Sequence, residues 1–324
     1  MNTFKRLVIA MAIAALACLC PAAAFAAPTS SGLAAGQALQ TELTAQEQGI
    51  QTQAKKSIFP QVKGVERYVA DKRSADSQRR TATAGGVTVN SYSTNRGVFA
   101  TALVSSTITA TYKGETKTLA TGVGPSFVTN GRYVFYAKGT TKAKVGTSSY
   151  MYDTYKSVIY RLDLKTGAKK KITSGKSWTI YGASKSYVYC GAQTTTALPN
   201  SLYAVNIKTG TKKFLSSRGT SSLEATSKRV AYTTLRGQVF CSTLYTCKAS
   251  GAGNKVADTN VDYFRLSGSK VIYLKGKYQN GTQYFRAMSC SLSGSGKKAL
   301  TGWREFNMDA YKQVCMKYKL GDYR

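Results

Sequence analysis

Carboxylates are the side chains in this sequence whose types and positions could support catalysis. The chain has 14 Asp and Glu residues against 46 Lys and Arg residues, so each acid in its second half stands out. Cleavage of a glycosidic bond needs two carboxyl groups about 5 to 9.5 Å apart, one of which protonates the leaving oxygen. The acids that could supply such a pair are Glu224, Asp258, Asp262 and Glu305. Asp262, Glu305 and Glu224 are therefore the catalytic candidates of a carboxylate-dependent, glycan-active enzyme.

Histidine is absent from all 324 residues. Its absence excludes catalytic triads built on imidazole, imidazole acid–base catalysis and histidine-ligated metal sites. Serine and lysine are abundant enough for a Ser/Lys nucleophile, but such composition has almost no specificity. We expect no metal and no cofactor, and a non-catalytic role is favoured over the glycan-active one.

Aromatic side chains accompany two of the acids on one predicted face. We expect Trp178, Tyr181 and Tyr152 to form a ligand site together with Asp262 and Glu305. Aromatic rings beside carboxylates suit a sugar or a peptide, because the rings offer apolar area and the carboxylates accept hydrogen bonds. The alternative is that Trp178 and Tyr181 only pack between repeats.

A second candidate site consists of cations. Six turns each carry one Arg or Lys shortly before an apolar strand. These cations are Arg96, Arg132, Lys185, Lys228, Lys270 and Lys312. Like charges held around one axis repel unless an anion or water relieves them. The pattern predicts either a basic ring that binds an anion or six solvated turn residues.

The elements that must position these residues are short strands in a repeat. Tyr160, Tyr203, Tyr245 and Met288 follow one another at intervals of 43, 42 and 43 residues. That interval is typical of a four-stranded propeller blade, and the aromatic and β-branched runs argue against helices. We predict an all-β fold, a β-propeller of four-stranded antiparallel blades, with six blades favoured and five as the alternative.

The repeat that begins at Trp178 shows the expected four strands most clearly. They cover residues 178–181, 186–190, 201–207 and 212–215. Antiparallel pairing places the turns after the first and third strands at one end, so the basic turns should gather there. The last repeat shows only two strands, the second at residues 314–316, and strands near residues 65–69 are expected to complete it.

Other recurring positions have a structural interpretation. Lysine recurs in the predicted fourth strands, where charge protects an exposed edge from pairing with other sheets. These lysines are Lys117, Lys170, Lys212, Lys255 and Lys297. Cys247 and Cys290 stand where other repeats carry Leu162 and Val205, so we expect them to be small buried apolar side chains.

The strands of the central repeat resemble those of exported bacterial β-propellers of the TolB-like type and of the propeller of low-density-lipoprotein-receptor proteins. The resemblance is carried by Tyr187, Val188 and Tyr189, by residues 202–205 and by residues 208–210. Similar sequence recurs from about residue 86 to the end. The resemblance implies a binding or scaffolding module.

The first residues have the pattern of an export signal. Lys5 and Arg6 precede an apolar run at residues 7–20, and the small residues at 24–26 fit a cleavage site. Lipid attachment at a cysteine within this run is a minor alternative. We expect residues 1–26 to be a signal peptide.

The remaining chain is expected to divide in two. Residues 27–84 are polar and predict a linker or weak helix that could donate closing strands, and residues 85–324 predict the propeller. Without residues 1–26 the chain keeps 44 basic and 14 acidic residues.

Such a charge suits anionic partners in the cell envelope, such as wall phosphates or acidic glycans. We predict a secreted or cell-surface protein without a transmembrane span that binds an anionic cell-wall polymer or an envelope protein. We do not expect it to bind nucleic acid.

Overall fold

The computed structural model describes residues 57–73, 78–93, 105–147, 150–193, 201–234 and 240–321. These residues belong to one compact unit, Lys55–Arg324. The expected signal peptide and most of the expected linker lie outside the described residues.

Twenty strands and one helix occur in the part of the chain that the structure describes. The strands are β1 (Val69–Ala70), β2 (Lys72–Arg73), β3 (Arg79–Ala84), β4 (Val87–Ser93), β5 (Ser106–Tyr112), β6 (Glu115–Thr129), β7 (Tyr133–Thr147), β8 (Tyr150–Asp163), β9 (Lys169–Ala183), β10 (Tyr187–Gln193), β11 (Ser201–Asn206), β12 (Lys212–Ser216), β13 (Thr220–Ala225), β14 (Arg229–Thr234), β15 (Ser242–Lys248), β16 (Lys255–Ser267), β17 (Lys270–Gln279), β18 (Thr282–Ser291), β19 (Lys298–Ala299) and β20 (Arg304–Glu305). The helix is α3 (Met308–Tyr318). The all-β fold class is confirmed.

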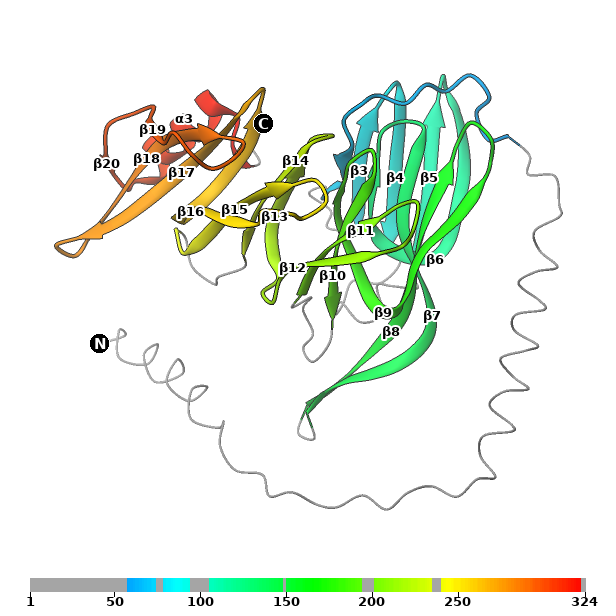
Figure 1. Ribbon diagram of the computed structural model, residues 1–324. Helices are drawn as coiled ribbons and strands as arrows, with labels where there is room; N and C mark the ends of the chain where they lie inside the picture. Colours follow the sequence, from blue (N-terminus) through cyan, green and yellow to red (C-terminus); the bar gives the residue numbers. More distant parts are fainter. Residues whose placement is uncertain are drawn as a thin grey trace, which may run out of the picture. The chain divides into compact units, whose positions relative to one another are not determined.

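The strands pair antiparallel in two sheets, and most of them pair with their neighbours in the chain. One sheet follows the order β2 to β12, with β1 paired to β6, and the other follows β13 to β19, with β20 paired to β18. In Figure 1 the first sheet runs from blue to green and the second from yellow-green to red. Among the described residues, no strand pairing joins the two sheets or closes either of them.

Three long strands each belong to two neighbouring repeats, because their first and last parts pair with different strands. The first part of β6 pairs with β5 and its last part pairs with β7, with a shift of register on each side. Strands β9 and β16 are divided between their partners in the same way. The described strands therefore form five four-stranded repeats: I (β3–β4–β5–β6), II (β6–β7–β8–β9), III (β9–β10–β11–β12), IV (β13–β14–β15–β16) and V (β16–β17–β18–β19).

The core consists of apolar clusters between consecutive repeats. Trp178 and Ile180 of repeat III, for example, pack with Phe135 and Ile159 of repeat II. The described residues show the same arrangement between repeats I and II, III and IV, and IV and V. Each repeat thus buries one face against the next, which is the physical basis of repeat architectures.

The recurring strand tyrosines lie in these interfaces. Tyr136, Tyr189, Tyr232 and Tyr273 are all 0% exposed. The Tyr189 hydroxyl of repeat III donates to the Ala249 carbonyl of repeat IV over 2.8 Å. The Tyr232 and Tyr273 hydroxyls likewise donate to Leu215 and Asp258 of the preceding repeats, so these three tyrosines both fill the core and connect repeats.

The first repeat differs from its sequence-based prediction. Residues 87–92 were expected to form its first strand, but β4 pairs on both sides, with β3 and with β5, and is its second strand. Gly85 and Gly86, with φ of 55° and 76°, supply the hairpin turn before it. Strand β3 thus precedes the boundary expected at residue 85. Arg96 falls in the connection after β4, outside the described residues.

The C-terminal segment is helical, so the strand predicted at residues 314–316 is wrong. The Asn307 side chain accepts the Ala310 N–H over 2.8 Å and caps helix α3, and Lys319 ends it with a φ of 53°. The buried residues Tyr311, Val314 and Cys315 have helical spacing. A run of three apolar residues fits a strand or a helix, and here the cap and the spacing decide.

Helix α3 packs where a further repeat was predicted. Tyr311, Val314 and Cys315 share a buried cluster with Leu274 of β17 and Phe285 of β18, and Figure 1 shows α3 beside these strands. The helix therefore covers the apolar face of repeat V. Within the described residues, no helix is long and apolar enough to cross a membrane.

Candidate anion-binding surface

The turns after the first and third strands of each repeat lie together, as antiparallel pairing predicts. We call this end of the repeats the turn end. Four backbone hydrogen bonds connect the two turns of repeats II to V: Leu164 N–H to Arg132 O (2.8 Å), Ile207 N–H to Ser186 O (2.9 Å), Ala249 N–H to Lys228 O (2.8 Å) and Leu292 N–H to Ser269 O (3.2 Å). The repetition of this bond shows that repeats II to V build their turn ends in the same way.

Short polar side chains shape these turns. The Asn130 side chain accepts the N–H groups of Arg132 and Tyr133 over 3.2 and 2.8 Å. Thr226 accepts the N–H of Arg229 in the equivalent turn over 3.0 Å, and Ser184 accepts that of Tyr187 over 3.2 Å. Side-chain oxygens of Asn, Ser and Thr mimic a backbone turn in this way.

Exposed lysines occupy the turn end of repeats II to V. They are Lys165, Lys185, Lys208, Lys228, Lys248 and Lys270. Within the described residues, none of the six forms an ion pair with a carboxylate. Consecutive repeats also meet here, because the Lys170 ammonium of repeat II donates to the Lys208 carbonyl of repeat III over 2.9 Å. The turn end is a surface of unneutralised positive charge.

Three of the six cations predicted to form a ring, Lys185, Lys228 and Lys270, are exposed at the turn end. Lys312 lies on helix α3 instead of in a turn, because the last segment is helical. Arg96 lies outside the described residues.

Arg132, the remaining cation of the predicted ring, forms an ion pair with Asp163. Its guanidinium donates to Asp163 over 2.8 and 3.1 Å and stands 5.0 Å from the ring centre of Tyr133. Burial alone would raise the pKa of Asp163, but hydrogen bonds from Arg132 and the Lys165 N–H lower it below its ordinary value. Arg132 therefore stabilises the two turns of repeat II by neutralising this carboxylate.

Two of the aromatic residues predicted to bind a ligand, Trp178 and Tyr181, are buried or half-buried between repeats. Trp178 is 0% exposed, packs edge-to-face on Tyr203 at 5.8 Å and lies under the Lys212 ammonium at 5.3 Å. Tyr181 is half-buried, and burial raises its pKa to about 12. These positions of Trp178 and Tyr181 fit the alternative interpretation, in which both side chains pack between repeats. Tyr152 lies in β8 opposite Val145.

The three catalytic candidates also have separate environments. Glu224 is buried, and its carboxylate accepts hydrogen bonds from Arg67 and the Leu266 N–H over 2.9 and 2.8 Å. Asp262 accepts the Tyr311 hydroxyl, and burial raises its pKa. Glu305 is exposed on β20.

Strands β17 and β18 lie between Asp262 on β16 and Glu305 on β20. Three strand spacings of about 4.8 Å place the two strand axes about 14 Å apart. That separation argues against a catalytic pair of Asp262 and Glu305.

Asp258, the fourth acid, takes part in a buried network. Its carboxylate accepts the Lys275 ammonium over 2.5 Å and the Tyr273 hydroxyl over 2.7 Å. Burial acts against ionisation, but these hydrogen bonds outweigh it and lower the Asp258 pKa. A carboxylate held in this way stabilises the interface between repeats IV and V.

The cysteines match their expected role. Cys247 and Cys290 are 0% and 1% exposed, and burial raises the pKa of both, to about 12 for Cys247 and about 11 for Cys290. Both thiols are free. Among the described residues, no group of His, Cys, Asp and Glu could hold a metal ion.

The segment before β1 lies elsewhere than predicted, because residues 65–69 were expected to complete the last repeat, whereas β1 pairs with β6. The Val65 N–H donates to the Asn130 carbonyl over 2.9 Å, and the Asn130 side chain donates to the Val65 carbonyl over 3.0 Å. This segment therefore crosses the turn end and brings Lys63 to it. Ile58, Phe59, Val62 and Val65 are apolar but have neither strand nor helix period, so no local pattern indicates the contact.

The fold and the turn end define an all-β repeat protein with a basic surface at one end of its repeats. No family model and no curated protein matches the chain. Among solved structures, TolB from Acinetobacter baumannii is 17% identical with a TM-score of 0.35, and the match covers 62% of this chain and 50% of that one.

Two enzymes are similar to the same extent. The acylaminoacyl peptidase of Pyrococcus horikoshii is 12% identical with a TM-score of 0.42, covering 77% of this chain and 40% of that one. An oligogalacturonate lyase is 14% identical with a TM-score of 0.39, covering 74% of each chain. The chain thus spans half or less of two of these three structures. TM-scores this low carry no argument about function, which must rest on the residues of this chain.

Proposed function

We propose that this protein is an exported, non-catalytic binding module that recognises an anionic polymer of the cell envelope through its turn end. The observation that carries the proposal is the row of exposed lysines at the turn end, Lys165, Lys185, Lys208, Lys228, Lys248 and Lys270. Export rests on the signal-like residues 1–26.

The charge of the turn end favours a polyanion over a single small anion. Lysines on neighbouring repeats are fixed to one scaffold, so their mutual repulsion is relieved when a ligand brings several negative charges at once. A polymer with regularly spaced anionic groups can contact more than one repeat, and each contact releases counterions. The predicted signature is an affinity that falls steeply with salt.

The arrangement of the acids supports a non-catalytic role. Glu224 and Asp258 are occupied by hydrogen bonds that stabilise the repeats, and Asp262 is bonded to Tyr311. General acid catalysis on a glycan needs a carboxyl that faces the substrate.

We further infer that repeats I to V are blades of a β-propeller. Each is a four-stranded antiparallel sheet that buries a face against the next, as blades do. An experimental structure in which the first strands of the repeats do not surround a common axis would overturn this inference.

Binding to labelled polymers tests the function. The chain without residues 1–26 is titrated against a fluorescent glycerol phosphate oligomer, polygalacturonate and neutral dextran. We expect binding to the polyanions alone, with a loss of affinity of about tenfold between low and physiological salt. Binding that is absent, insensitive to salt or equal for dextran would overturn the proposal.

A matched pair of variants separates the turn end from net charge. Lys228→Gln/Lys270→Gln removes two charges at the turn end, and Lys156→Gln/Lys312→Gln removes two exposed charges on β8 and α3, away from these turns. We expect only the first pair to weaken binding markedly, by about fivefold. Equal losses in both pairs would show attraction by net charge and would overturn the assignment to the turn end.

A further inference from the structure

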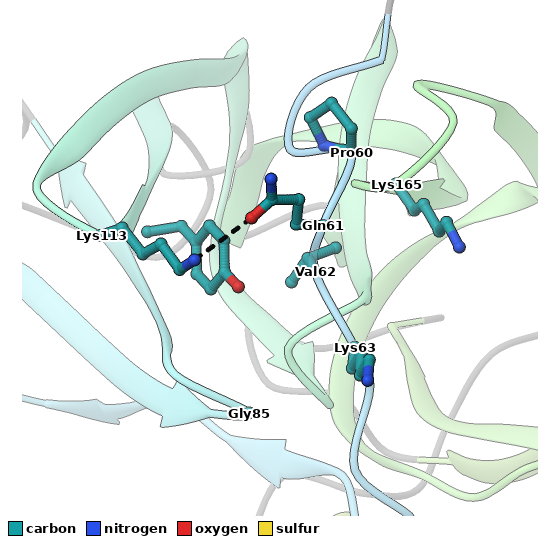
Figure 2. A pocket seen from close by; sticks show the side chains of 8 residues that line it. Pro60, Gln61, Val62, Lys63, Gly85, Lys113 and Lys165 are labelled. Atoms are coloured by element: carbon teal, nitrogen blue, oxygen red, sulfur yellow. Dashed lines mark hydrogen bonds between the residues drawn. The ribbon is translucent and has the colours of Figure 1, made fainter.

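A hollow opens at the turn end between repeats I and II. It has a volume of about 590 Å³ and is lined by Pro60, Gln61, Val62, Lys63, Gly85, Tyr112, Lys113 and Lys165. Figure 2 shows the segment from Pro60 to Lys63 passing between Lys113 on one side and Lys165 on the other. Both of these lysines lie in the turn between the third and fourth strands of their repeats.

The wall formed by this segment is firmly attached. Phe59 and Val62 are each 2% exposed and belong to the core between repeats I and II. The Phe59 N–H donates to the Leu164 carbonyl over 2.8 Å, and the Lys117 ammonium donates to the Ile58 carbonyl over 2.7 Å. The backbone around the hollow is therefore fixed before any ligand binds, which lowers the entropic cost of binding.

The chemistry of the lining is that of an anion site. Three of its eight residues are lysines, and none is an acid or an arginine. Lys113 donates to the Gln61 side-chain oxygen over 3.2 Å and stands 5.6 Å from the ring centre of Tyr112, as Figure 2 shows for the hydrogen bond. The acid that follows Lys113 in the chain, Glu115, is 2.9 Å from Lys117.

The absence of arginine from this lining favours one kind of anion. A planar guanidinium matches a carboxylate with two parallel hydrogen bonds, whereas lysine acts as a mobile point charge and is a common phosphate ligand. The Tyr112 ring adds an apolar face beside the charges, which suits the carbon skeleton attached to a phosphate.

We propose that the hollow between repeats I and II binds a phosphate group of a polyol or sugar phosphate polymer, with Lys113 and Lys63 as the cations, Tyr112 against the carbon skeleton, and Lys165 adding positive potential from the other side of the segment. The inference rests on the proposed function, because it names the ligand class and the place where the turn end holds it. Gln61 orients Lys113 at the entrance.

A pair of isosteric substitutions tests the hollow. Gln61→Glu places a carboxylate beside Lys113, neutralising it and repelling phosphate. Gln279→Glu is the matched control, because Gln279 is also exposed and also accepts a lysine, Lys277, over 2.7 Å, in the hairpin of β17 and β18. Both variants change the net charge by the same amount, and equal thermal unfolding temperatures would verify that both fold.

The probe is a synthetic glycerol phosphate oligomer, with polygalacturonate as the carboxylate comparison. We expect Gln61→Glu to weaken binding of the phosphate oligomer about tenfold and Gln279→Glu to change it by less than about twofold. Lys113→Gln should weaken it in the same direction as Gln61→Glu, since it removes the cation directly.

The possible failures are distinguishable. Equal binding by Gln61→Glu and Gln279→Glu, with the wild type still binding, would overturn the hollow and leave the proposed function standing. Failure of the wild type to bind any polyanion would overturn both. Equal affinity for polygalacturonate and the phosphate oligomer, with Gln61→Glu weakening both, would overturn the choice of phosphate.

Discussion

The Tyr311 hydroxyl connects helix α3 to repeat V, and the substitution Tyr311→Phe removes it while retaining the ring. Tyr311 is 6% exposed, its ring centre lies 5.5 Å from that of Phe285 and 5.4 Å from that of Phe306, and its hydroxyl donates to Asp262. A hydrogen bond to a charged group contributes about 1.5 to 3 kcal/mol, so the free energy of unfolding should fall by about 2 kcal/mol at neutral pH.

The loss should depend on pH through Asp262. Burial raises the pKa of Asp262, and the hydrogen bond from Tyr311 opposes that rise. Because the folded-state pKa exceeds the unfolded one, the folded protein binds the proton more tightly. The protein therefore loses stability as the pH rises through the window between the unfolded-state and folded-state pKa values of Asp262. Without the hydroxyl the pKa rises further, so the variant loses more above the window. Below it the hydroxyl meets a neutral carboxyl, and the loss should be about 1 kcal/mol.

Urea unfolding followed by circular dichroism, at neutral pH and at a pH below the ordinary aspartate pKa, measures both losses. The Asp262→Asn background is the control, because an amide oxygen also accepts the hydroxyl but carries no charge. We expect Tyr311→Phe to cost about 1 kcal/mol there at every pH. Equal losses in both backgrounds and at both pH values would refute the charged hydrogen bond as the link between α3 and repeat V.

Three further predictions concern other parts of the structure. Asp258→Asn should cost about 3 kcal/mol in urea unfolding, because it leaves the Lys275 ammonium without its counter-charge. Hydrogen bonds lower the Asp258 pKa despite burial. The wild type should therefore lose this stability as the pH falls from the ordinary aspartate pKa through the lowered one. The same loss of stability with falling pH in Asp258→Asn would contradict the assignment to Asp258. Phe285→Ala, at a 0% exposed position against α3, should cost about 4 kcal/mol and speed limited proteolysis of the helix, whereas Phe214→Ala, at a 51% exposed position, should cost about 1 kcal/mol at most. Trp303→Phe leaves Trp178 as the single tryptophan, and its fluorescence should be quenched weakly by acrylamide, so strong quenching would contradict its burial.

Much of the fold could be predicted from local sequence. The recurrence of Tyr160, Tyr203 and Tyr245 indicates the repeat, and Gly167 and Gly210, with φ of 71° and 75°, lie in the turns where the pattern placed them. These features depend on residues close together in the chain. The helix was missed because Val314 and Cys315 are too few to reveal a period.

The candidate surface could be predicted only in part. Lys185, Lys228 and Lys270 are exposed in their turns as the pattern indicated, because a turn between paired strands faces solvent. Arg132 occupies the equivalent turn, yet Asp163, 31 residues away, neutralises it. An ion pair of this kind depends on which turns meet, and the period of the repeat does not report it.

The sequence by itself determined the strands, the repeat and the excess of positive charge, because alternation, turn residues and composition act over a few neighbouring positions. Only the tertiary structure decided which cations remain unpaired, that α3 covers repeat V, and that Gln61, Lys113 and Lys165 line one hollow. These residues are brought together by the backbone and core contacts of residues 58–65, which join positions far apart in the chain. Contacts at that separation depend on how whole repeats pack, and no local pattern encodes them.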